Sequence, residues 1–302
     1  MLTTGLSLYE RVAQATSTLV IRQYSTSFGL ASRLLDTSSR QHVENIYALV
    51  RIADEIVDGV AAEAGIDQAG VRRLLDDLEA QTELAMTSGY STNLIVHAFA
   101  STARSTGFGS ELTEPFFRSM RTDLDRAEHT PESFNDYIYG SAEVVGLMCL
   151  RGFLLGTTVS ASERARLEEG ARRLGAAFQK VNFLRDLSAD FALLGRSYFP
   201  GVSVGSFTET DKNRLLDDID DDLAVSAVSI RRLPKGSKRA VALAHGLFGE
   251  LSARLRATPA DELTRSRVRV PDPVKLRLAA EAATGRLPKS TPTTSTQSKV
   301  TE

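Results

Sequence analysis

The stretch from residue 179 to residue 190, QKVNFLRDLSAD, places a polar stripe on a helix that is otherwise apolar. Its polar side chains are three, three, one and four residues apart, so at about 3.6 residues per turn they share one face. They are Gln179, Asn182, Arg185, Asp186 and Asp190. A helix that is apolar most of the way round is normally buried, and buried acids or guanidinium groups are costly unless they are paired or bound to a metal. The stripe therefore predicts the lining of an internal cavity.

A second stretch, residues 47–58 with the sequence YALVRIADEIVD, has the same arrangement. Tyr47, Arg51, Asp54 and Asp58 are four, three and four residues apart, again on one face of an apolar helix. An aspartate pair one turn apart suits Mg²⁺, a hard cation that binds through a few carboxylates together with substrate phosphates. Such spacing also occurs in ion pairs on solvated helix faces, so one stretch alone leaves both interpretations open. Two such stretches in apolar helices favour a metal site.

Helical periodicity dominates the chain and the alternation typical of strands is nearly absent, which predicts an all-α fold. We expect one helical domain over residues 1–286 and a disordered tail at 287–302, where Thr, Ser and Pro leave little to bury. A bend is expected at 25–37 and a loop at 193–209. The expected helices are 6–24, 39–60 (capped near Ser38 or Ser39), 71–85, 92–106, 110–127, 131–157, 160–192, 210–232, 236–257 and 271–285.

Charge and cysteine content exclude several classes of function. Lys and Arg number 36 against 38 Asp and Glu, a balance that argues against nucleic acid as a partner. The single cysteine, Cys149, excludes an intrachain disulfide and a cysteine zinc site. No signal peptide is visible, and the longest apolar run, 144–156, is interrupted by Arg151 and too short to span a bilayer. We expect a cytoplasmic protein, with peripheral contact to the inner membrane surface left open.

An acid cluster at residues 217–222, DDIDDD, also invites interpretation as a metal site. Consecutive acids point all round a helix instead of converging on one point. The cluster is therefore predicted to be a solvated helix face, without a metal.

Five segments, in order along the chain, resemble the squalene/phytoene synthase family of head-to-head prenyl transferases. YALVRIADEIVD and NFLRDLSAD are similar to the two aspartate-rich motifs of that family. YSTSF at 24–28, YIYGSAEVVG at 137–146 and GRSYFP at 195–200 are similar to three further motifs. The resemblance covers nearly the whole chain, from about residue 8 to about residue 285.

This resemblance implies an isoprenoid-synthase-type helical bundle around a central cavity. It implies Mg²⁺, or Mn²⁺ in its place, held by Asp54, Asp58, Asp186 and Asp190. It also places the remaining site residues. Those assigned to the diphosphate or the metal site are Arg51, Arg185, Gln179, Asn182 and Arg267, and those assigned to the substrate and its reacting ends are Tyr47, Tyr137, Ser25, Ser27 and Phe28.

Two departures from the family pattern stand out: Ala189, where relatives often have Glu, and Phe248, where a relative has Tyr. The expected activity is the joining of two C20 prenyl diphosphates to phytoene, with prenyl diphosphates as the binding partners. A C15 enzyme making squalene or dehydrosqualene is the alternative, and a non-catalytic assembly protein of the same fold is a third interpretation. No glycine-rich nucleotide fingerprint is present, so no nicotinamide cofactor is expected. No oligomeric state follows from the sequence.

Overall fold

The computed structural model describes residues 4–194 and 197–288, with the side chains of 189–194 and of Val204 excepted. Throughout this described part the chain forms helices and no β-strand, so the all-α prediction is confirmed. The elements are α1 (Gly5–Tyr24), α2 (Thr26–Ser32), α3 (Thr37–Val57), α4 (Val60–Glu63), α5 (Gln68–Ser88), α6 (Leu94–Thr106), α7 (Ser110–Asp125), α8 (Pro131–Ile138), the π-helical turn η1 (Tyr139–Glu143), α9 (Val144–Phe153), α10 (Ala161–Leu194), the 3₁₀ turn η2 (Val204–Ser206), α11 (Glu209–Ile230), α12 (Lys235–Ala257), α13 (Ala260–Leu263) and α14 (Asp272–Ala283).

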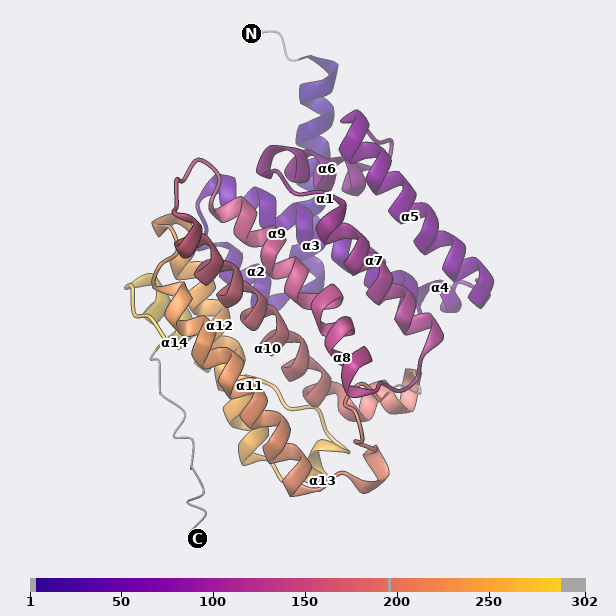
Figure 1. The fold of residues 1–302 in the computed structure, drawn as a ribbon, viewed down its shortest axis with the longest axis vertical. Helices are drawn as coiled ribbons and strands as arrows, with labels where there is room; N and C mark the ends of the chain where they lie inside the picture. Colours follow the sequence, from indigo (N-terminus) through magenta and orange to yellow (C-terminus); the bar gives the residue numbers. More distant parts are fainter. Residues whose placement is uncertain (1–3, 195–196, 289–302) are drawn as a thin grey trace.

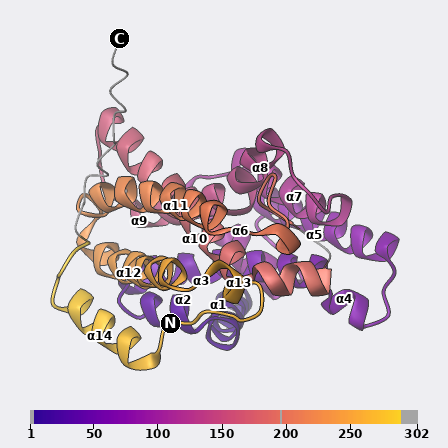
Figure 2. The ribbon, with the colours of Figure 1, turned by 90° about the horizontal axis from the view of Figure 1, so that it is seen from below.

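The long helix α10 crosses the middle of the molecule (Figure 1). It packs against α9 and η1 on one side and against α11 and α12 on the other. Figure 2 shows α14 at one outer edge, next to α12, and α4 and α5 at the opposite edge. The helix that carries the second aspartate motif is therefore the element around which the others assemble.

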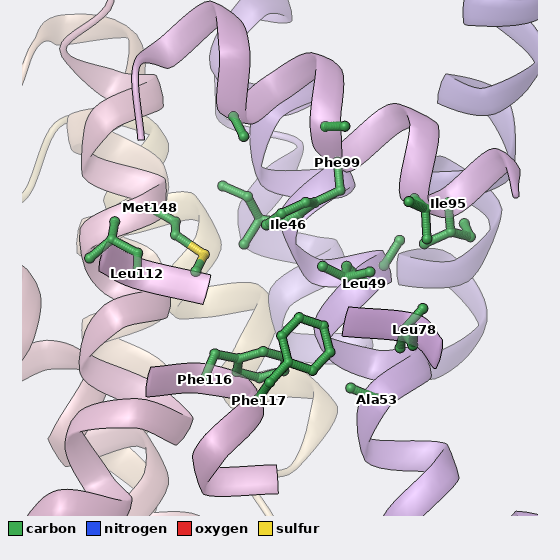
Figure 3. Close-up of a cluster of buried hydrophobic side chains, with 14 of the residues drawn as sticks. Ile46, Leu49, Ala53, Leu78, Ile95, Phe99, Leu112, Phe116, Phe117 and Met148 are labelled. Carbon is green, nitrogen blue, oxygen red and sulfur yellow. The ribbon is translucent and has the colours of Figure 1, made fainter. Parts of the chain in front are cut away.

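One core cluster fixes the orientation of α3. Ile46, Leu49 and Ala53 are buried in a cluster with Phe99 of α6 and with residues of α7 (Figure 3). Burying a side chain of this size stabilises the fold by about 1.5–3 kcal/mol. Because these positions lie on the face of α3 away from Arg51 and Asp54, burying them turns the polar stripe toward the other side of the helix.

A second cluster does the same for α10. Val181 and Leu184 are fully buried together with Leu216 and Ile219 of α11. These positions lie on the face of α10 opposite Gln179 and Asn182. The polar stripe of α10 therefore faces away from α11.

Two glycines bring α10 into backbone contact with η1 and α9. A Cβ on Gly146 would lie 2.4 Å from the carbonyl oxygen of Ala171, and one on Gly175 would lie 2.5 Å from that of Ala142. Real Cβ atoms do not approach a carbonyl oxygen so closely, so these two positions require glycine. At these two points the distance between α10 and the η1–α9 segment is set by main-chain atoms, without a side chain between them.

Several boundaries differ from the prediction. The expected bend at 25–37 contains α2, because the Ser25 hydroxyl accepts a hydrogen bond from the Phe28 N–H at 3.0 Å and so caps a short helix. The cap of α3 is Asp36, which accepts a bond from Ser39 N–H at 2.8 Å. The expected single helix 131–157 is divided by η1.

The predicted tail begins against the body of the molecule. Leu287 packs on a hydrophobic cluster, and the carbonyl of Pro288 accepts a hydrogen bond from Arg231 at 3.0 Å. Residues 289–302 of that tail lie outside the described residues. Among the helices described, none is both long and apolar enough to span a membrane.

Candidate functional site

A cavity of about 990 Å³ lies between the two aspartate helices. It is lined by α2, α3, η1 and α9, by α10, α11 and α12, and by the segment 267–275. Many of the residues singled out in the sequence line it: Ser25, Ser27, Phe28, Tyr47, Arg51, Asp54, Gln179, Asn182, Arg185 and Arg267. Part of each polar stripe thus reaches one space, whereas Asp58 and Asp186 are not among the described residues that line it.

Arg51 stands at the polar end of the cavity. Its guanidinium pairs with Glu55 one turn along α3 and lies over the ring of Tyr24, 4.7 Å from the ring centroid. Its Nε is buried and has no hydrogen-bond partner within the described part of the chain. A buried donor of this kind is costly, and an oxyanion in the cavity would satisfy it.

Asp54 lies one turn further along α3. Burial raises the pKa of its carboxyl well above the usual range, and the nearby charge of Asp58 raises the pKa further, while Arg51 opposes both. Asp123 adds to the same repulsion. Repulsion between buried carboxylates is relieved by a divalent cation, and carboxylate oxygens are ligands that suit Mg²⁺.

Asp58 sits where α3 ends. Its N–H donates to the carbonyl of Asp54 at 2.8 Å, and the chain then leaves the helix through Gly59, which has φ of 108°. The side chain of Asp58 is exposed. The helix thus ends at the second aspartate, one turn beyond Asp54.

Asp186 of α10 is held by two arginines. Arg185 Nε lies 3.0 Å from its Oδ1, and Arg267 Nε lies 2.7 Å from the same oxygen. Arg267 comes from the segment between α13 and α14, far along the chain. Asp186 is therefore paired with guanidinium groups, whereas the charges that act on Asp54 are mostly those of other acids.

The part of the cavity away from these charges is apolar. Phe28 packs on Phe178 and Phe248, with ring centroids 5.6 Å away in each case, and Phe178 stacks on Phe248 at 3.9 Å. The departure at Phe248 thus contributes a ring to an aromatic wall where a tyrosine would bring a hydroxyl. Cys149 also lines the cavity, and burial raises the pKa of its thiol to about 12.

Tyr47 lies between the charged and the aromatic parts of the cavity lining, since it is near both Arg51 and Phe28. Burial raises the pKa of its hydroxyl, and Arg51 and a hydrogen bond with Ser25 act in the opposite direction. The Tyr47 ring also lies 6.3 Å from that of Phe28. Ser25 therefore has two tasks, because it both caps α2 and contacts the Tyr47 hydroxyl.

Tyr137 is buried, with 3% of its surface exposed, and is not among the described residues that line the cavity. Its hydroxyl donates to Asp123 of α7 at 2.8 Å, and the hydroxyl of Tyr198 donates to the same carboxylate at 3.2 Å. Sequence reasoning missed Asp123 and Tyr198. Tyr198 does lie in the segment GRSYFP, which was the available signal, while Asp123 belongs to none of the motifs singled out in the sequence.

Some residues singled out in the sequence lie outside the part of the chain that the structure describes. They are the side chains of Ala189 and Asp190 and the whole of residues 195 and 196, at the start of GRSYFP. Among the side chains that are described, no group of three or more His, Cys, Asp or Glu is already gathered around a common point for a metal ion.

Comparison with known proteins points to the same family as the sequence motifs. The sequence profile of the squalene/phytoene synthase family matches residues 21–273. A phytoene synthase from Pseudescherichia vulneris is 26% identical over 253 residues, covering 77% of this chain and 79% of that protein. A 4,4'-diapophytoene synthase from Staphylococcus haemolyticus is 26% identical over 204 residues, covering 66% and 67%. The crystal structure of a dehydrosqualene synthase in complex with ligand superposes with a TM-score of 0.76 at 22% identity, over 91% of this chain and 96% of that one.

Proposed function

The chain belongs to the squalene/phytoene synthase family of prenyl transferases, and we propose that it is a phytoene synthase. It joins two geranylgeranyl diphosphates head to head, through a cyclopropylcarbinyl diphosphate, to give phytoene. The observation that carries this proposal is the cavity itself, which has arginines and acids at one end and aromatic and aliphatic walls over the rest. A volume of about 990 Å³ lies at the upper end of the roughly 300–1,000 Å³ usual for ligand sites.

The metal sites of the proposal are Asp54 and Asp58 on one helix and Asp186 and Asp190 on the other. Bound Mg²⁺, or Mn²⁺, supplies neutralisation of the negative charge that grows on a departing diphosphate. The raised pKa of Asp54 supports this assignment, because that carboxyl lacks enough positive charge in the protein alone.

Three arginines orient the diphosphates. Arg51 offers the buried Nε that has no partner among the described residues. Arg185 and Arg267 are paired with Asp186, so a bound diphosphate would exchange these ion pairs: the guanidinium groups would turn to phosphate oxygens, and the Asp186 carboxylate would be available to hold a metal ion. No charge is left unpaired in that exchange, which limits its cost.

The apolar wall protects the allylic cation. Phe28, Phe178 and Phe248 exclude water from the end where the prenyl chains lie side by side. The thiol of Cys149 stays protonated because of its raised pKa, so it is a poor nucleophile toward that cation. The final cation then loses a proton, which needs only a base such as the departed diphosphate.

The choice of C20 over C15 substrate rests on likeness to bacterial phytoene synthases. The match to a 4,4'-diapophytoene synthase keeps a C15 enzyme as the second candidate. The test is extraction of hydrocarbon products from purified protein with Mg²⁺ and either geranylgeranyl or farnesyl diphosphate, each with and without NADPH. Phytoene from the C20 substrate without reductant is expected. Turnover of farnesyl diphosphate alone, with squalene when NADPH is added, supports the second candidate, and release of no diphosphate from either substrate supports a non-catalytic protein.

A further inference from the structure

A buried carboxylate on α7 joins two tyrosines from different parts of the chain. Asp123 has 9% of its surface exposed, and each of its oxygens accepts one phenolic hydrogen bond. Tyr137 of α8 donates to Oδ2 at 2.8 Å, and Tyr198, which follows α10, donates to Oδ1 at 3.2 Å. A charged acceptor makes hydrogen bonds about twice as strong as a neutral one, so this pair of contacts fixes both rings.

The segment that carries Tyr198 is anchored independently. Ser197 N–H donates to the carbonyl of Ala127 at 2.7 Å, and the Ser197 hydroxyl donates to the carbonyl of Val202 at 2.6 Å. The Tyr198 ring stacks on Phe183 of α10 at 3.8 Å between centroids, with the planes only 7° apart. Asp123 is thereby connected, through Tyr198, to the turn of α10 just before Arg185 and Asp186.

The helix that carries Asp123 packs on α3 next to the first aspartate pair. Met120 and Leu124 of α7 lie in one hydrophobic cluster with Ala53 and Val57 of α3, the sequence neighbours of Asp54 and Asp58. The Tyr137 hydroxyl donates its proton to Asp123. Both aspartate motifs consequently have a structural connection to this one acid.

We propose that Asp123 is a positioning residue of the active site, which orients the hydroxyls of Tyr137 and Tyr198 and so holds Tyr137 and the end of α10 in register with Asp54 and Asp58. This inference rests on the proposed function. In this role Asp123 accepts hydrogen bonds from the two hydroxyls and is not a metal ligand. Its effect on the reaction passes through the groups that it orients.

The main test is Asp123→Asn, which keeps the volume and one acceptor but removes the charge. Displacement of a positioned group by about 1 Å can cost on the order of 100-fold, so we expect kcat to fall about 10- to 100-fold. KM for the prenyl diphosphate should change much less, because Arg51 and Arg185 are untouched. In a Tyr137→Phe background, Asp123→Asn should lower kcat only by the several-fold expected from its remaining contact with Tyr198, since losses at residues that act through one contact are not additive.

The matched control is Asp222→Asn. Asp222 is also a buried aspartate, 1% exposed, but it pairs with Arg173 and Lys180 on the far side of α10 from the site. We expect this variant to lose stability and to keep the kcat of the folded protein. Equal loss of kcat in both variants, or additive losses for Asp123→Asn and Tyr137→Phe, would show that burial of an acid matters and positioning does not, and would overturn the proposal.

Two further arms keep the proposal testable. If Asp123→Asn does not fold, Tyr198→Phe removes one of the two hydrogen bonds and should lower kcat several-fold with KM nearly constant; an unchanged kcat overturns the proposal. The chain has no Trp, so tyrosine emission can be followed directly, and it should rise in Asp123→Asn because a carboxylate bonded to a phenol quenches emission. Unchanged emission would show that the Asp123 carboxylate does not contact the tyrosine hydroxyls in solution, and would overturn the proposal. Wild-type protein that converts neither substrate overturns the proposed function and this role with it, whereas active wild type with full kcat in Asp123→Asn overturns this inference alone.

Discussion

The molecule has two acid-rich regions that differ in what surrounds them. At the end of α3, Asp54 lies among Asp58, Asp123 and Glu55 with Arg51 as the opposing charge, and its pKa is raised. On α11, the acids of the 217–222 cluster are matched by cations from α10 and α12. The pairs are Asp222 with Arg173 at 2.9 Å and Lys180 at 2.8 Å, Asp218 with Lys180 at 2.6 Å, and Asp217 and Asp220 each with Arg256 at 2.9 Å.

The difference shows that counter-charge, more than the number of acids, separates a candidate cation site from a structural one. The cluster on α11 has more acids in a row, yet three cations of α10 and α12 pair with four of them. It is also not simply a solvated face, as the sequence suggested, because Asp222 is 1% exposed. The acids around Asp54 are fewer, but only Arg51 opposes their negative charge there, and Asp54 itself lines the cavity.

The largest effect expected from this comparison is on turnover. Asp54→Asn and Asp186→Asn should each lower kcat/KM by about two orders of magnitude or more, because each removes a proposed ligand of the leaving-group metal. Chelation of Mg²⁺ should abolish turnover of the wild type. Initial rates of diphosphate release, measured against Asp221→Asn, give the comparison. Equal damage from Asp221→Asn would mean that the wrong acids have been assigned.

For stability we expect the reverse order: substitution in the α11 cluster should cost more than substitution of Asp54. Asp222→Asn is expected to lower the free energy of unfolding by about 2–3 kcal/mol, because it leaves Lys180 and Arg173 without a buried partner. Urea unfolding measures this, with Asp54→Asn in chelator as the comparison. If Asp54→Asn lowered the free energy of unfolding as much as Asp222→Asn does, the two acid-rich regions would not differ in the way described.

The pH dependence of stability sharpens the same contrast. The folded-state pKa of Asp54 lies above the unfolded value of about 3.9. The folded protein therefore binds this proton more tightly, and the stability it contributes is lost as pH rises from about 4 through the folded pKa. In chelator, Asp54→Asn should match wild type near pH 3.5 and become the more stable of the two by pH 7. Unfolding curves at the two pH values decide this, and a variant less stable at pH 7 would contradict it.

The smallest effect should come from Asp221→Asn. Asp221 is exposed, and surface substitutions usually change stability by less than about 0.5 kcal/mol. Neither turnover nor the unfolding midpoint should move measurably. A clear change in either would give this acid a task that its position on α11 does not suggest.

Sequence reasoning was most successful where function follows helical spacing. The stripes of α3 and α10 were visible because three- and four-residue gaps place side chains on one face, and apolar neighbours imply burial. It failed where the partners are distant in sequence. Asp123 meets Tyr198 across 75 residues, and Arg267 meets Asp186 across 81, so local periodicity carries no trace of either contact.

Local structure was missed where a single hydrogen bond or packing contact decides it. The short helix α2 depends on the Ser25 cap, and the π-helical turn η1 interrupts a stretch that reads as one continuous helix. The carbonyl of Tyr137, at that turn, instead accepts a hydrogen bond from Ser119 of α7 at 3.3 Å. Such features are chosen by the tertiary environment and override the propensity of the segment.

The backbone contact at Gly146 and Gly175 has a consequence for how this protein can diverge. Both glycines line the cavity, and neither has room for one more carbon atom. A mutation that thickened the wall there would push α10 outward and carry Asp186 with it, so the breadth of the cavity at this point and the position of this proposed metal ligand are inherited together. A change in the length of the cavity has to come from walls made of side chains, such as those of Leu150, Phe153 and Leu167.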